Sequence, residues 1–200
     1  LHPRWCAGVA RTWPPQLGNF ADDPRFKGNL MHQASTLARQ VDASLQWSDL
    51  KWLRDIWPGR LVLKGIMTPE DARRAADHGM DGLVVSNHGG RQLDGARSTI
   101  SALPGIADAV GGQVELLLDS GVRRGSDIVK AIALGADGVL LGRAYVYGLA
   151  AAGEAGVSAA LRLLAIEMDN TMALMGVSSI AELKTRGKEL VGGPAGSQLI

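Results

Sequence analysis

Short apolar runs alternate with helix-like segments along the central part of the chain. Four of these runs, near residues 61–64, 83–86, 115–118 and 139–142, lack the period-two alternation of a half-exposed strand. Such runs are typical of parallel strands that helices cover on both faces. Each segment between two runs has room for one helix and its turns. The pattern therefore predicts four consecutive strand–helix units around a parallel sheet.

An internal repeat supports this interpretation. Residues 61–86 and 117–142 match when one copy is shifted onto the other, and both contain Gly-x-Asp-Gly followed by an apolar triplet. In that register Asp81 meets Asp137 and Gly82 meets Gly138. The shift corresponds to two strand–helix units of about 28 residues each. The repeat therefore predicts that the two halves of the sheet share one architecture.

Polar residues follow each predicted strand, and their distribution separates two α/β folds. Lys64, Asn87-His88, Asp119 and Gly142-Arg143 come directly after the four strands. In a (β/α)₈ barrel the functional groups lie at this rim, contributed by several strands. An open doubly wound sheet would instead concentrate a G-x-G-x-x-G turn after one strand, and the sequence has no such motif. We predict an α/β fold, half of a TIM (β/α)₈ barrel.

The half-barrel is expected to span residues 48–191, with a different kind of segment before it. Residues 1–47 contain four prolines and are predicted to form loops followed by an amphipathic helix from Asn29 to Leu45. Ser48 is a suitable N-cap for a helix that ends at Ile56. We expect this first segment to face substrate or membrane.

The end of the chain predicts one further helix and then a tail. Residues 157–175 have the pattern of a closing helix that ends near Gly176. Residues 192–200 show no periodicity, so we expect a flexible tail there.

Composition excludes several classes of function. The formal net charge is +1, so no single-sign field would attract a nucleic acid. The single cysteine, Cys6, excludes an intrachain disulfide framework and a multi-cysteine zinc site, and no metal is expected. There is no apolar run long enough to span a membrane and no export signal, which favours the cytoplasm. The first residue is Leu1, and we interpret the chain as part of a longer polypeptide.

All five tryptophans precede the repeats, at positions 5, 13, 47, 52 and 57. They can be ordinary packing residues. Tryptophans beside an amphipathic helix are also typical of a surface that rests on a bilayer. Peripheral contact with the inner face of a membrane therefore stays open.

The segment from Asp119 to Gly125 predicts a phosphate site. Its glycines let backbone N–H groups approach an anion at the start of a helix. Arg123 and Arg124 can add charge-assisted hydrogen bonds, and Gly142-Arg143 would form a second wall. Phosphate sites after the last two strands recur in this fold. The alternative is a tight turn with solvated arginines.

The segment from Ser86 to Asp94 predicts acid–base chemistry. His88 would lie at the end of a strand in a glycine-rich turn, where an imidazole can accept a proton near neutral pH. Arg91 can bind a carboxylate through two parallel hydrogen bonds. Together they suit an organic acid whose neighbouring hydroxyl is deprotonated.

Lys64 ends an apolar strand, where an unpaired charge is costly, so it needs an anionic partner. Two partners are open: the pyrimidine edge of a reduced flavin, and a carboxylate from another strand.

These motifs resemble those of the FMN-dependent 2-hydroxy-acid dehydrogenases and oxidases. The similarity runs from Leu1 to about Leu183, and the two segments just described resemble the family's hallmark stretches. Leu1-His-Pro-Arg-Trp5, Gln16-Leu-Gly-Asn-Phe20 and Trp52-Leu-Arg-Asp-Ile-Trp57 are most similar to the (S)-mandelate and L-lactate dehydrogenase branch.

The resemblance implies a role for each candidate residue. His88 would be the base that removes the proton from the 2-hydroxyl or from carbon 2, and Arg91 would bind the substrate carboxylate. Lys64 would stabilise the N1–C2 carbonyl edge of FMN. The ribityl chain and phosphate would be held by Asp119, Gly121, Arg123, Gly142 and Arg143.

The resemblance also implies that the matching region is the C-terminal half of the barrel, strands 5–8. In relatives the first four strands provide a substrate-binding tyrosine, further FMN contacts and a carboxylate partner for the histidine. We therefore expect this chain alone to be inactive. Quinone, cytochrome or oxygen is the expected electron acceptor, a small (S)-2-hydroxy acid the substrate, and a homo-oligomer the assembly.

Two other functions stay open from the sequence. In a phosphate-binding barrel aldolase or isomerase, Lys64 would form a Schiff base. A half-barrel could also be a non-catalytic interaction module.

Overall fold

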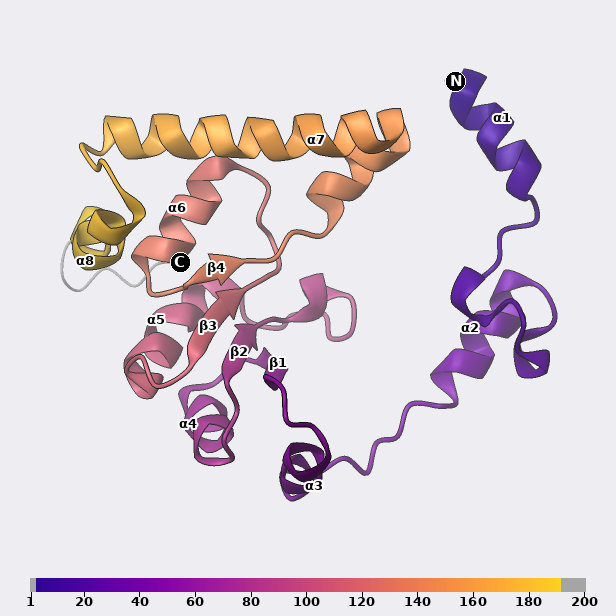
Figure 1. The fold of residues 1–200 in the computed structure, drawn as a ribbon, viewed down its shortest axis with the longest axis horizontal. Helices are drawn as coiled ribbons and strands as arrows, with labels where there is room; N and C mark the ends of the chain where they lie inside the picture. Colours follow the sequence, from indigo (N-terminus) through magenta and orange to yellow (C-terminus); the bar gives the residue numbers. More distant parts are fainter. Residues whose placement is uncertain (1–2, 192–200) are drawn as a thin grey trace. The chain divides into compact units, whose positions relative to one another are not determined.

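A computed structural model describes residues 3–191, without the side chain of Arg4 (Figure 1). The tail predicted for residues 192–200 lies outside the described residues. The chain divides into two compact units between Asp49 and Leu50, and each unit is described by itself.

The first unit is more helical than the prolines predict. Helix α1 (Pro3–Thr12) occupies a stretch expected to be loop, because proline at a first helical position costs no backbone hydrogen bond. Two 3₁₀ turns, η1 (Gly18–Phe20) and η2 (Pro24–Phe26), stack Phe20 on Phe26 with ring centroids 4.4 Å apart. The buried amide of Gln33 accepts a hydrogen bond from the backbone N–H of Leu17.

Helix α2 (Leu30–Ala38) begins as expected and ends earlier. The Asn29 side chain caps it by accepting a hydrogen bond from the N–H of His32. The predicted continuation to Leu45 is wrong. The Asp42 carboxylate instead accepts hydrogen bonds from both the backbone and the hydroxyl of Ser44, which forms a local turn.

The second unit contains a four-stranded parallel sheet in the order β1-β2-β3-β4. The strands are β1 (Val62–Ile66), β2 (Gly82–Val85), β3 (Glu115–Leu118) and β4 (Gly138–Val139), close to the predicted runs. Each strand pairs with the next in parallel, with Leu63 opposite Leu83 and Leu83 opposite Leu116. The observed architecture is a partial barrel.

Helices connect the strands. Helix α3 (Asp49–Ile56) precedes β1, as predicted from Ser48. Helices α4 (Pro69–Asp77), α5 (Thr99–Val110) and α6 (Gly125–Ala133) follow β1, β2 and β3. The core between sheet and helices contains Leu83, Val85, Leu103, Ile106, Leu116, Leu118 and Val129.

Helices cover one face of β3, whereas the sequence predicts cover on both faces. Leu116 and Leu118 are buried, while Glu115 is exposed and Leu117 is only partly buried. Successive side chains of a strand point to opposite faces. The second face of β3 is therefore open, as expected of the inner face of half a barrel, whereas all four residues of β2 are buried.

Two helices close the unit after β4. Helix α7 (Arg143–Leu174) begins well before residue 157 and is broken at Ala152 and Gly153. An added Cβ at Gly148 would meet the backbone of Gly156, so these glycines let the two parts of α7 touch. Helix α8 (Ile180–Val191) packs with α7 onto α6, around Val129, Ile132, Met172 and Leu183.

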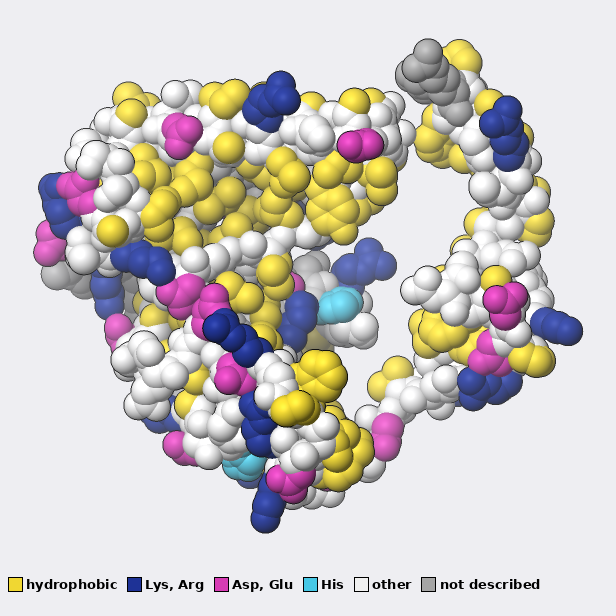
Figure 2. Space-filling model, viewed as in Figure 1, with side chains coloured by type: hydrophobic (Ala, Val, Ile, Leu, Met, Phe, Trp, Pro, Cys, Tyr) yellow, Lys and Arg dark blue, Asp and Glu magenta, His cyan; other side chains and the backbone are white. Residues whose placement is uncertain are grey.

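Helix α7 is the one helix among the described residues that is long and apolar enough to cross a membrane by length and composition. Figure 2 shows apolar side chains gathered beneath this helix. Its Leu164 and Met172 are buried, and its Glu167 binds the backbone of Gly125 at the start of α6. These contacts pack one side of α7 against α6, while only 6% of its most apolar stretch is buried in this structure.

Candidate active site

A cavity of about 740 Å³ lies where β1, β2, β3 and β4 end. Its walls come from the segments after β2, β3 and β4 and from Lys64, which lies within β1 because that strand runs to Ile66 and does not end at Lys64 as predicted. All eight candidate residues line it: Lys64, His88, Arg91, Asp119, Gly121, Arg123, Gly142 and Arg143. Ser120, Val122 and Tyr147 line it as well.

Lys64 and Asp119 form an ion pair across this cavity. Lys64 Nζ lies 2.8 Å from Asp119 Oδ2 and donates a hydrogen bond of 2.8 Å to Ser86 Oγ. Of the two partners left open for Lys64, the carboxylate from another strand is thus present. Nearly half of the Lys64 side chain (45%) remains exposed, so the ammonium still faces the cavity.

The environment of Asp119 keeps it ionised. Burial is the largest influence and would raise the pKa of this carboxyl group. Hydrogen bonds from Lys64, Ser120 and Ser86, with the charge of Lys64, outweigh it and hold the pKa of Asp119 below its ordinary value. The site therefore contains a fixed negative charge beside Lys64.

His88 lies in a tight turn, η3 (His88–Gly90), directly after β2. Its φ is +56°, in the left-handed region that non-glycine residues rarely adopt. The N–H of His88 donates to Ser86 Oγ (3.1 Å), and that of Gly89 donates to Ser120 Oγ (2.9 Å). Two serine hydroxyls thus hold the turn that carries the imidazole.

The predicted backbone phosphate cradle at residues 119–125 needs correction. The N–H groups of Arg123 and Arg124 both donate to Asp127 Oδ2, at 2.9 and 3.0 Å. The N–H of Gly125 donates to Glu167 Oε2 at 2.9 Å. Carboxylates of the protein itself therefore occupy the amides at the start of α6, and these amides cannot bind a ligand.

Two other expectations about this loop change for the same reason. Arg124 points to Glu167, with 3.3 Å between Nη1 and Oε1, and does not line the cavity. An added Cβ at Gly125 would overlap the backbone of Leu164 and Met168. Gly125 therefore serves the close approach of α6 and α7 rather than an anion.

The remaining donors suit a phosphate. No hydrogen bond or ion pair joins the side chains of Arg91, Arg123 or Arg143 to another described residue, and all three line the cavity. Helix α7 begins at Arg143, so its first N–H groups lack helical partners. With Lys64, the cavity carries four cationic side chains against Asp119, which fits a dianionic ligand.

Residues that the sequence did not single out support the side chains that line the cavity. Thr99, at the start of α5, is buried and donates to the carbonyl oxygens of Asp119 (2.7 Å) and Ser120 (3.2 Å). Ser86 is also buried. The position of Ser86 and Ser120 just after strands β2 and β3 was the available signal, because this rim gathers functional groups.

Known proteins are similar to this chain in sequence and in fold. Residues 1–189 match the family described as FMN-dependent dehydrogenase. An L-lactate dehydrogenase of Caulobacter vibrioides is 54% identical over 184 residues, 92% of this chain and 48% of that protein. The crystal structure of the monotopic membrane protein (S)-mandelate dehydrogenase superposes with a TM-score of 0.82 at 49% identity, covering 91% of this chain and 48% of that one.

A mandelate oxidase mutant with a monooxide FMN adduct is also similar, with a TM-score of 0.68 and 48% identity over 70% of this chain and 45% of that one. The chain belongs to the FMN-dependent dehydrogenase family. It spans about half the length of the curated relatives it matches. This agrees with a sheet of four strands, half the number in a complete barrel.

Proposed function

We propose that this chain is the FMN- and base-bearing half of an enzyme that oxidises a small (S)-2-hydroxy acid to its 2-keto acid. One observation carries the proposal. A single cavity is lined by an imidazole, His88, a carboxylate-binding guanidinium, Arg91, and a cationic pocket suited to a phosphate, Arg123 and Arg143. Family membership supplies the reaction class.

FMN fits the donor set of the cavity. Arg123, Arg143 and Gly142 would hold its phosphate, Asp119 and Gly121 its ribityl chain, and Lys64 its pyrimidine edge. Backbone approach at Gly121 is unhindered, since no atom lies within 4 Å of an added Cβ there and its φ is +88°. When bound, FMN supplies the acceptor for the two electrons that leave the substrate.

The substrate is bound and deprotonated by the chain's own side chains. Arg91 would hold the carboxylate through parallel N–H donors, which fixes the orientation of carbon 2. An imidazole nitrogen of His88 would accept the proton as the keto acid forms. The serine-held turn restricts where that nitrogen can lie.

The aldolase alternative does not fit the site. The Lys64 Nζ that would form the imine is instead held 2.8 Å from the Asp119 carboxylate and donates a hydrogen bond to Ser86 Oγ. Membership of the FMN-dependent dehydrogenase family also argues against this alternative.

A chimera tests the proposal. In this chimera, residues 1–189 of this chain replace the matching half of the Caulobacter vibrioides L-lactate dehydrogenase. We expect a yellow protein whose visible flavin absorbance bleaches without oxygen when L-lactate or (S)-mandelate is added. A folded chimera that binds FMN but bleaches with neither acid would refute the proposed activity.

The remaining features of the proposal concern the whole protein. We propose residues 1–47 as the substrate- or membrane-facing segment and residues 48–191 as the FMN-binding half-barrel, in a cytoplasmic homo-oligomer with a quinone, cytochrome or oxygen as acceptor. Peripheral membrane contact is supported by the similarity to a monotopic membrane protein and by the exposed Trp5 and Trp13. Sedimentation of the chimera with anionic vesicles, with and without Trp5→Ser and Trp13→Ser, tests this contact.

A further inference from the structure

Two strained residues meet in the cavity. Among the described residues, His88 (φ +56°) and Ser120 (φ +73°) are the two non-glycine residues with a left-handed backbone. They lie in loops after different strands, β2 and β3. A hydrogen bond from the N–H of Gly89 to Ser120 Oγ joins the two loops. Such strain persists only where surrounding contacts maintain it, and it gathers at functional sites.

The hydroxyl of Ser120 occupies the centre of a polar chain. It accepts from Gly89 and donates to Asp119 Oδ1 at 2.6 Å, while Asp119 Oδ2 binds Lys64. A second route leads from Lys64 Nζ through Ser86 Oγ to the N–H of His88. Consecutive amides of the His88 turn are therefore both tied to the Lys64–Asp119 ion pair.

Glycine would be the favoured residue at position 120 on backbone grounds alone, because it adopts a positive φ without a steric penalty. Ser120 has that conformation nonetheless. Buried Thr99 holds the carbonyl of residue 120 from helix α5, so the backbone there does not depend on the serine hydroxyl. The hydroxyl is thus free to serve another purpose, and the contact it makes across the cavity is with the His88 turn.

We propose that Ser120 is a positioning residue, whose hydroxyl clamps the His88 turn to the Lys64–Asp119 ion pair and so fixes the imidazole relative to the substrate. The inference rests on the proposed function for its catalytic consequence. The clamp itself is a property of this chain and can be measured without turnover. Ser86 provides the parallel tie and defines a second, weaker arm of the same clamp.

Ser120→Gly separates positioning from folding, because it removes the hydroxyl and suits the left-handed backbone. In this chain we expect amide hydrogen exchange at Gly89 to accelerate by about tenfold or more, since a lost hydrogen bond of about 1.4 kcal/mol corresponds to that factor. The thermal midpoint should stay within about 3 °C. Ser158→Gly, at an exposed site on α7, is the matched control and should leave exchange at Gly89 unchanged.

In the chimera, Ser120→Gly should lower kcat about tenfold or more while KM stays within about twofold, because a misplaced base slows the chemical step and leaves carboxylate binding to Arg91 intact. Ser120→Ala should lower kcat similarly and be less stable than Ser120→Gly, since alanine keeps the left-handed strain that glycine relieves. Unchanged exchange at Gly89 in Ser120→Gly would overturn the clamp. Unchanged kcat in an active chimera would overturn its catalytic role.

These results are distinguishable from failure of the proposed function. An unsubstituted chimera that binds FMN but oxidises neither acid would refute the activity. The exchange experiment in this chain would still decide whether Ser120 holds the His88 turn.

Discussion

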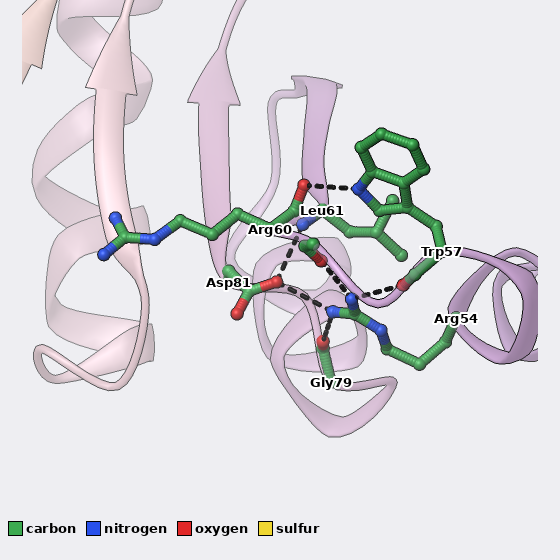
Figure 3. Close-up of polar contacts among 7 residues, drawn as sticks. Arg54, Trp57, Arg60, Leu61, Gly79 and Asp81 are labelled. Atoms are coloured by element: carbon green, nitrogen blue, oxygen red, sulfur yellow. Dashed lines mark hydrogen bonds and ion pairs between the residues drawn. The ribbon is translucent and has the colours of Figure 1, made fainter.

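The two ends of the same sheet differ in how their charged side chains are paired. At the amino ends of the strands, Asp81 accepts from the N–H of Leu61 (2.7 Å) and pairs with Arg54 at 2.8 Å (Figure 3). Asp137 does the same one repeat later, with the N–H of Leu116 (2.8 Å) and Lys184 (2.7 Å). At the carboxyl ends Lys64 pairs with Asp119, whereas the side chains of Arg91, Arg123 and Arg143 line the cavity without a partner among the described residues.

Figure 3 shows how complete the pairing is at the amino end. The Arg54 guanidinium reaches the carbonyl oxygens of Trp57, Gly59 and Gly79 as well as Asp81. Both terminal nitrogens of Arg54 are thus bonded within the protein, so this guanidinium holds elements together and does not face a ligand. The repeated Gly-x-Asp-Gly therefore marks the stabilising end of the sheet, and the polar residues at the carboxyl ends of the strands mark the functional end.

The largest effect on turnover is expected at His88, which lies at the carboxyl ends of the strands. In the chimera, His88→Asn should reduce kcat/KM by about 10²–10⁴-fold, because the general base is lost. Asparagine tolerates the left-handed backbone of this position, so the thermal midpoint should be unchanged. His78→Asn, on the loop after α4, is the control and should retain turnover. Equal losses in both variants would refute the assignment of the base.

Gly125→Ala tests whether every part of the carboxyl rim is functional. An added Cβ would overlap the backbone of α7, so we expect a loss of about 3 kcal/mol in the free energy of unfolding, measured by urea denaturation. Gly112→Ala is the matched glycine control. It has open space and a positive φ, and should cost about 1 kcal/mol. Equal costs would show that α6 and α7 can separate without penalty.

Adjacent arginines offer a sharper contrast within the same loop. Arg123→Ala should weaken FMN binding by the chimera about 10–100-fold, the loss of a charge-assisted contact of about 1.5–3 kcal/mol. Riboflavin, which lacks the phosphate, should lose little affinity. Arg124→Ala should leave both affinities unchanged, because Arg124 binds Glu167 outside the cavity. If Arg124→Ala is the more damaging change, the phosphate pocket is wrongly placed.

Sequence reasoning succeeded where the signal is local. Apolar runs predict the four strands, and the residues that end them predict the cavity, because parallel strands bring their carboxyl ends to one rim. It failed where a distant residue decides. The amide of Gly125 suits a phosphate cradle by sequence, but Glu167, 42 residues away, occupies it. The amides of Arg123 and Arg124 are occupied by nearby Asp127, a local signal that the sequence prediction did not use.

The same limit applies to the helices and to Lys64. The apolar spacing up to Leu45 predicts a longer α2, but Val41 and Leu45 find no core to pack against and stay exposed. The two possible partners of Lys64 could not be separated without the position of β3, which supplies Asp119. Pairings between strands depend on topology, which no local pattern encodes.

The smallest effect is expected at the amino end of the sheet, where the thermal midpoint should depend on pH. The backbone hydrogen bond from Leu61, followed by Arg54, lowers the pKa of Asp81; burial would raise the pKa of Asp137, but Leu116 and Lys184 lower it. A carboxyl whose folded pKa is depressed stabilises the fold above its unfolded pKa of about 3.9, and this stability is lost as pH falls through the folded pKa.

Asp81→Asn and Asp137→Asn should each lower the thermal midpoint modestly at pH 7 and flatten its decline below about pH 4. Thermal melts at pH 7 and pH 3 measure this, with Asp169→Asn, on the exposed side of α7, as the control. A decline as steep in both variants as in the unsubstituted chain would show that the stabilising role belongs elsewhere, because the titrating group would have been removed without consequence.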